Sequence, residues 1–147
     1  MSADTRYLLD TNVISEPSRP RPDPAVMAWL AGTDEDLMFL SVATLAEINR
    51  SVEKLPAGKR QRLLRAWLLE DLVTRFEPRI LPVDAGVAML WGVLVARAER
   101  AGRDIEAMDA LIAATAERHS LTLVTRNVAD FAHLSLPLLN PWDIPKP

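Results

Sequence analysis

Apolar runs of strand length alternate along this chain with longer segments in which apolar residues recur every three or four positions. The strand-like runs are YLL (7–9), LMFLSV (37–42), RILPV (79–83) and LTLVT (121–125). The helix-like segments cover residues 24–30, 42–55, 58–76, 84–100 and 105–119. Because strands and helices alternate, the pattern predicts an α/β fold with a mainly parallel central sheet.

Short polar residues mark where several of these helices begin. Asp23, Ser41 and Asp84 each stand directly before or at the start of a helical segment and are predicted N-caps. The stretch SEPSRPRPDP (15–24) contains four prolines and is predicted to be a stiff loop without regular structure. No strand or helix is predicted in the tail LPLLNPWDIPKP (136–147).

Three acidic residues stand among apolar neighbours. Asp10 ends the first strand-like run, Glu47 lies within ATLAEI, and Asp109 lies within AMDALIAATA. Each of them could be a local cap or an acid that faces water. This explanation is weakest for Asp109, because Ile105, Ile112 and Ala113 share its side of the helix and only Glu106 nearby is polar. A carboxylate in such a setting is expected to have a raised pKa or a cationic partner.

The expected topology suggests that this partner is a bound metal ion. Ligands of open α/β sheets bind beyond the carboxyl ends of the strands, where Asp10 and the pair Thr125 and Asn127 are expected. If the helices turn Glu47 and Asp109 toward the same crevice, the carboxylates need a cation to stay ionised together. Oxygen ligands without cysteine favour Mg²⁺, or Mn²⁺, which can ionise a water and stabilise charge on a phosphate.

Composition narrows the setting of this chemistry. The 147 residues are 49% hydrophobic and 25% charged, which is typical of one globular domain, here residues 1–147. No apolar run is long enough to span a membrane, and the first residues lack the layout of a secretory signal, so a cytoplasmic protein is expected. A net charge of −3 is unusual for a protein that holds nucleic acid by charge alone.

The motifs LLDTNVISE (8–16), TLAEI (44–48) and AMDALIAATAERHSLTLVTRN (107–127), with NPW near the end, resemble those of PIN-domain ribonucleases. Within that family, the chain is most similar to VapC toxins of bacterial toxin–antitoxin pairs, and among these to the FitB-type branch. The resemblance covers nearly the whole chain and implies a three-layer α/β/α PIN-like domain. Asp10, Glu47 and Asp109 match the acidic residues of the family. Asn127 falls where FitB-type sequences tend to carry a fourth Asp, which leaves the fourth ligand open between Asn127 and Asp130.

The resemblance implies a Mg²⁺-dependent endoribonuclease with Asp10, Glu47, Asp109 and Asn127 as catalytic residues. Asp10 and Asp109 would hold the metal, Mg²⁺ or Mn²⁺, and Glu47 would hold a second ion or position water. Thr11 and Thr125 would steady the carboxylates or the attacking water. Implied partners are an RNA substrate, a cognate antitoxin and a second copy in a homodimer. Operator DNA would be bound only through the antitoxin, and no membrane is involved.

Two other functions compete with this one. In a phosphotransfer domain, Asp10 would accept a phosphoryl group. Such domains usually have a downstream lysine, and the only lysines here are Lys54, Lys59 and Lys146. One class of them also has an Asp at the position of Asn12. A degenerate PIN domain that binds an antitoxin as a co-repressor without nuclease activity is the other, and three retained acids argue against it. The tryptophans are predicted to pack in the core or at a subunit interface, and His119 and His133 to lie at the surface. The basic stripe of KRQRLLR (59–65) is either solvated or a contact for RNA or an acidic partner.

Overall fold

The computed structural model describes residues 4–145 and contains a five-stranded parallel sheet in the order β3-β2-β1-β4-β5. The strands are β1 (Tyr7–Leu9), β2 (Met38–Ser41), β3 (Ile80–Leu81), β4 (Thr122–Val124) and β5 (Leu138–Leu139). Tyr7 pairs with both Met38 and Thr122, so β1 is the central strand. All four strand pairs are parallel, which confirms and sharpens the predicted mainly parallel sheet.

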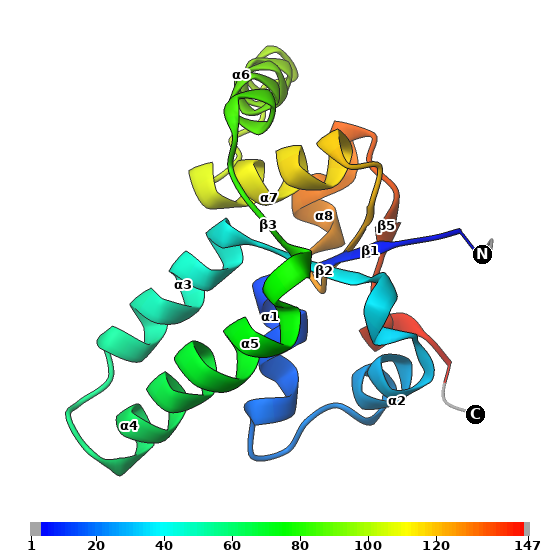
Figure 1. Cartoon of the computed structure of the whole chain (residues 1–147). Helices are drawn as coiled ribbons and strands as arrows, with labels where there is room; N and C mark the ends of the chain where they lie inside the picture. Colours follow the sequence, from blue (N-terminus) through cyan, green and yellow to red (C-terminus); the bar gives the residue numbers. More distant parts are fainter. Residues whose placement is uncertain (1–3, 146–147) are drawn as a thin grey trace.

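Helices cover both faces of this sheet (Figure 1). On one side lie α1 (Thr11–Ser15), α2 (Pro24–Gly32), α3 (Val42–Glu53), α4 (Lys59–Ala66) and α5 (Val73–Phe76). On the other lie α6 (Ala85–Arg100), α7 (Ala107–Arg118) and α8 (Val128–Phe131). A π-helical segment, Trp67–Leu72, joins α4 to α5. The helix predicted over residues 58–76 is therefore nearly continuous, with one widened stretch in its middle.

Alternation along the central strand creates two cores. Tyr7 and Leu9 pack on one face with the α1–α5 layer, whereas Leu8 packs on the other with α6 and α7. Both faces are thus apolar, as expected for a parallel sheet between helical layers. This arrangement confirms the three-layer α/β/α architecture.

The predicted caps are present. Asp23 accepts hydrogen bonds from the amides of Ala25 and Val26, and Ser41 accepts one from the Ala43 amide. Asp84 caps α6 in the same way through the Val87 amide. These side chains satisfy amides that the first helical turn leaves without partners.

Two predictions about irregular segments are wrong. Glu16–Ser18 forms a 3-10 turn, so the proline-rich stretch becomes irregular only after it. Leu138–Leu139 forms the edge strand β5, which pairs with β4 although the tail shows no strand pattern. Residues 146–147 of that tail, and residues 1–3, lie outside the described part. None of the helices within residues 4–145 is long and apolar enough to cross a membrane.

Candidate active site

Asp10 lies at the centre of the site because it follows the central strand and caps α1. Its amide donates to the Val124 carbonyl oxygen at 2.9 Å, which extends the β1–β4 pairing to the strand end. Its Oδ1 accepts from the Thr11 amide at 2.8 Å, and its Oδ2 accepts from the Thr125 hydroxyl at 2.7 Å and from Asn12 Nδ2 at 3.4 Å. The side chain is held by three donors and is only 4% exposed. Burial raises the pKa of Asp10, against the lowering effect of the Thr125 and Thr11 hydrogen bonds.

Glu47 reaches the site from the second turn of α3. The Thr11 hydroxyl donates to Glu47 Oε1 at 2.7 Å, so Thr11 joins both carboxylates, through its amide to Asp10 and through its hydroxyl to Glu47. Partial burial raises the pKa of Glu47, and the negative charges of Asp10 and Glu106 raise it further. Thr11 therefore positions the side chains of Asp10 and Glu47 relative to each other.

Asp109 lies in the first turn of α7 and faces the same space. Burial raises its pKa to about 6, with further contributions from the charges of Asp10, Glu106, Glu47 and Asp130. The raised pKa is the behaviour expected from the apolar surroundings of Asp109 in the sequence. Because the charges of these four acids raise the Asp109 pKa, the carboxylates must lie close enough to repel one another across a common space.

That space is a cavity of about 370 Å³ at the carboxyl edge of the sheet. Five carboxylates line it: Asp10, Glu47, Glu106, Asp109 and Asp130. Its other lining residues are Thr11, Asn12, Ser15 and Asn127. The structure thus brings together all four residues predicted from the sequence, Asp10, Glu47, Asp109 and Asn127, whose catalytic roles stay predictions.

Glu106 is a lining residue that the sequence analysis noticed only as a neighbour of Asp109. It occupies the N-cap position of α7 without making a side-chain cap bond, which leaves its carboxylate exposed and free to face the cavity. The available signal was the acid pair at positions i and i+3 that opens this helix.

Asn127 and Asp130 reach the cavity from the turn after β4. The Asn127 amide donates to the Thr125 hydroxyl at 3.0 Å, so Thr125 links this turn to Asp10. Asp130 lies within α8, which begins at Val128, so it is not a residue that caps this helix. Asp130 instead lines the cavity and acts on Asp10 and Asp109 through its charge.

The donor set suits a hard divalent cation. Among residues 4–145, no Lys or Arg lines the cavity, so none of these side chains neutralises the carboxylates from its wall. Carboxylate and amide oxygens are the ligands that Mg²⁺ and Mn²⁺ prefer. Within residues 4–145, however, no three acidic or histidine side chains are already gathered into a metal-binding cluster. The carboxylates would have to converge as an ion binds.

Other residues considered in the sequence lie away from this cavity. His119 lies in the turn between α7 and β4, as predicted, and both His119 and His133 are half-buried rather than fully exposed. All four tryptophans pack against one of the two cores, as predicted. In the basic stripe on α4, Arg65 forms an ion pair with Glu53 at 2.9 Å, while Lys59 and Arg62 are exposed.

Comparison with known proteins agrees with this geometry. Residues 7–135 match the family described as PIN domain. The chain is 42% identical to "Toxin FitB" of Neisseria gonorrhoeae over 135 residues, which cover 92% of this chain and 97% of that protein. It is 35% identical to "VapC ribonuclease Y4jK" of Sinorhizobium fredii over 136 residues, or 92% and 97% of the two chains.

A solved structure shares the fold closely. The one described as "Structure of FitAB bound to IR36 DNA fragment" superposes with a TM-score of 0.89 at 38% identity, over 95% of this chain and 98% of that chain. The family match spans most of the chain, the FitB-like resemblance is confirmed, and the acidic cavity lies at the expected edge of the sheet. The chain belongs to the PIN-domain family.

Proposed function

We propose that this protein is a divalent-metal-dependent endoribonuclease and the toxin of a toxin–antitoxin pair. The observation that carries the proposal is the cavity at the carboxyl edge of the sheet, with five carboxylates and, among the described residues, no basic residue in its wall. The similarity to a protein named toxin and to one named ribonuclease supports both halves of the proposal. Acids that raise one another's pKa values are frequent at catalytic sites.

Asp10 and Asp109 would hold the metal, Mg²⁺ or Mn²⁺. When bound, the ion would supply positive charge for the scissile phosphate and lower the pKa of a coordinated water. Asp10 is suited to the role because three donors fix its orientation. Asp109 is suited because its destabilised negative charge gains most from a nearby cation.

The chain's own residues would orient the water and the substrate. Glu47, held by Thr11 at 2.7 Å, would accept a hydrogen bond from the attacking water or help to hold a second ion. Thr125 would keep Asp10 aimed at the cavity. Asn127 would offer a neutral oxygen and Asp130 a charged one from the same turn.

The competing functions fit this site less well. A co-repressor without nuclease activity would not need the acids that the cavity retains, and the relatives named ribonuclease favour the enzyme. A phosphotransfer domain needs a cation beside its Asp, and no lysine in the described part of the chain lines the cavity. Asn12 moreover donates to Asp10 at the position where one such class has an Asp.

The partners follow from the same proposal. A cognate antitoxin would neutralise the protein in the cytoplasm, and operator DNA would be bound through that antitoxin. The solved FitAB structure on a DNA fragment supports an assembly of this kind. For the homodimer, α6 offers a surface with Met89 at 76% and Val93 at 48% exposure beside the small residues Gly92 and Ala96.

Incubation of the purified protein with total RNA, with and without Mg²⁺, tests the activity. Cleavage should require the ion, stop in excess EDTA, and be lost in Asp10→Asn. The exposed acid Asp71 lies in the π-helical segment and does not line the cavity, so Asp71→Asn is the matched charge control and should cleave normally. Full cleavage in EDTA, or by the Asp10→Asn protein, would contradict the proposal.

A further inference from the structure

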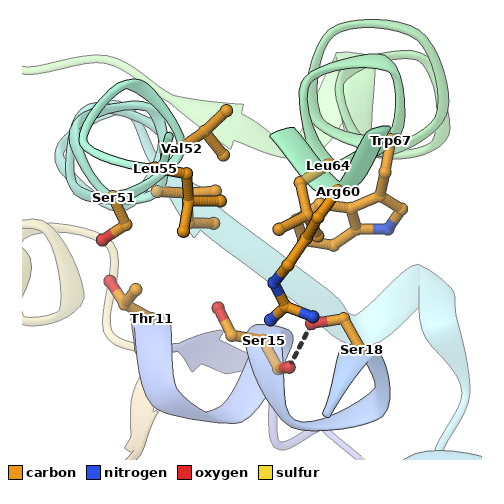
Figure 2. Close-up of a pocket in the computed structure, with 10 residues that line it drawn as sticks. Thr11, Ser15, Ser18, Ser51, Val52, Leu55, Arg60, Leu64 and Trp67 are labelled. Atoms are coloured by element: carbon orange, nitrogen blue, oxygen red, sulfur yellow. Dashed lines mark hydrogen bonds between the residues drawn. The ribbon is translucent and has the colours of Figure 1, made fainter. Parts of the chain in front are cut away.

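A second cavity adjoins the acidic one. It has a volume of about 200 Å³ and lies between α1 and the hairpin that α3 forms with α4 (Figures 1 and 2). Thr11 and Ser15 line both cavities, so the two lie next to each other along α1. Nothing in the proposed chemistry uses the second cavity.

Its walls are mainly apolar. They come from Ile48, Val52 and Leu55 of α3 and its end, and from Leu64 and Trp67 across the hairpin. Figure 2 shows Val52 and Leu55 on one side of the space between the two helices, and Leu64 and Trp67 on the other. Such walls can cover the faces of one flat ring, and a volume below the roughly 300–1,000 Å³ of drug-sized pockets limits the occupant to one group of that size.

Its rim carries polar groups without partners. Among the described residues, the hydroxyls of Ser15 and Ser51 and the guanidinium of Arg60 make no side-chain hydrogen bond or ion pair. Figure 2 shows Arg60 reaching from α4 toward Ser15 and Ser18 on the opposite side. Free hydroxyls suit the edge of a base, and a free guanidinium suits a phosphate.

We propose that this second cavity binds one unpaired nucleobase of the RNA next to the scissile phosphodiester, with Arg60 on a flanking phosphate. The proposal rests on the proposed nuclease function. Thr11 connects the two cavities, because it lines the second cavity and its hydroxyl donates to Glu47 in the acidic one. A strand with its cut phosphate at the acids would place a neighbouring nucleotide over Ser15 and Ser51.

The charge distribution favours RNA over a protein side chain as the occupant. The acidic cavity repels phosphates, so a substrate needs a cation close by, and Arg60 supplies one within the adjoining cavity. Because single-stranded RNA is read by packing bases on apolar or aromatic surfaces and bonding their edges, the mixed lining fits such a base. An antitoxin side chain at the same place is the alternative that the test must separate.

The test compares cleavage of a random oligoribonucleotide library in Mg²⁺ by wild type and variants, with the cut ends sequenced. Ser51→Phe fills the cavity, and Arg60→Ala removes the cation. Asn49→Phe adds the same bulk at an exposed site elsewhere on α3, and Arg62→Ala removes a neighbouring exposed cation, so these are the matched controls. We expect a base preference at one position beside the cut in wild type and both controls, and a loss of that preference in Ser51→Phe.

Arg60→Ala should lower the rate at all sequences and weaken its dependence on salt, because a phosphate contact reads no base. An abasic scan of one good substrate adds a coupling measurement. Removing the base that enters the cavity should cost wild type about tenfold in kcat/KM, the size of one stacked base, and should cost Ser51→Phe nothing more.

The possible outcomes distinguish a failure of the base-binding proposal from a failure of the proposed nuclease function. If wild type cuts no RNA, the nuclease proposal fails, and binding of the abasic series by Asp10→Asn protein still tests the cavity. If wild type cuts with a preference that Ser51→Phe leaves intact, or if the abasic and Ser51→Phe effects multiply, the base-binding proposal is wrong. A Ser51→Phe protein with normal cleavage but weakened antitoxin binding would assign the cavity to the antitoxin instead.

Discussion

Replacing Asp109 by asparagine should stabilise the metal-free protein while abolishing cleavage. The ordinary pKa of 3.8 is raised to about 6 in the folded state, first by burial and then by the charges of Asp10, Glu106, Glu47 and Asp130. The folded protein therefore holds the Asp109 proton more tightly than the unfolded chain does. Asp109 therefore does not lower the free energy of unfolding below about pH 4. Its destabilising effect grows between about pH 4 and 6 and is complete above about pH 6.

The size of the effect follows from that difference. The gap between 3.8 and about 6 corresponds to at most about 3 kcal/mol, because one pH unit is worth about 1.4 kcal/mol. Solvent reaches part of the Asp109 side chain, and screening reduces this to about 1–2 kcal/mol. The helix dipole favours an acid in the first turn of α7 by roughly 0.5 kcal/mol, which Asn loses. A net gain of about 1 kcal/mol should raise the melting temperature by about 2–4 °C at pH 7.5.

Thermal and urea unfolding in EDTA, at a series of pH values from 4 to 8, measure this directly. The gain of Asp109→Asn should vanish near pH 4, and Asp71→Asn should show no such trend. Adding Mg²⁺ should stabilise wild type by mass action and should have little effect on Asp109→Asn. An Asp109→Asn protein that is less stable than wild type at pH 7.5, or equally changed at pH 4 and pH 8, would refute the reasoning.

Three further predictions test other parts of the molecule. Thr125→Val removes the donor to Asp10 and the acceptor of the Asn127 amide, so it should lower the free energy of unfolding in urea by about 1–3 kcal/mol. Loss of that hydrogen bond should also raise the Asp10 pKa, so the Mg²⁺ concentration needed for cleavage should increase more at pH 6 than at pH 8. Asn127→Asp should lower the Mg²⁺ concentration for half-maximal cleavage and Asp130→Ala should raise it; unchanged values in both would place neither residue at the metal. Met89→Glu should convert a dimer into a monomer by light scattering, whereas Leu63→Glu, at another exposed apolar residue on α4, should not.

The sequence was most informative where one residue type has one local job. Asp23, Ser41 and Asp84 could be recognised as caps because the amides they bond lie two or three positions away. The acidic site was also accessible, because the carboxyl end of β1 and an acid in an apolar helix each point to the same edge of a parallel sheet.

Features defined by distant contacts could not be predicted in this way. The two-residue strand β5 exists only because β4 pairs with it, and its own residues, Leu138–Leu139, lie between prolines. The five-residue helix α1 is set by the Asp10 cap rather than by periodicity. Glu106 looked like an ordinary exposed acid, since only the packing of α7 against α3 brings it to the cavity.

The edge strand β5 has a consequence for the order in which the surroundings of Asp10 can form during folding. The Thr125 amide donates to the Leu139 carbonyl oxygen at 2.9 Å, and the Thr125 hydroxyl in turn orients Asp10, 115 residues earlier. The first and nearly the last described segments must therefore meet before the site has its final shape. Until Leu138–Leu139 has paired with β4, the Thr125 amide lacks this partner, so the final geometry around Asp10 depends on a contact between distant segments that forms only as the chain folds.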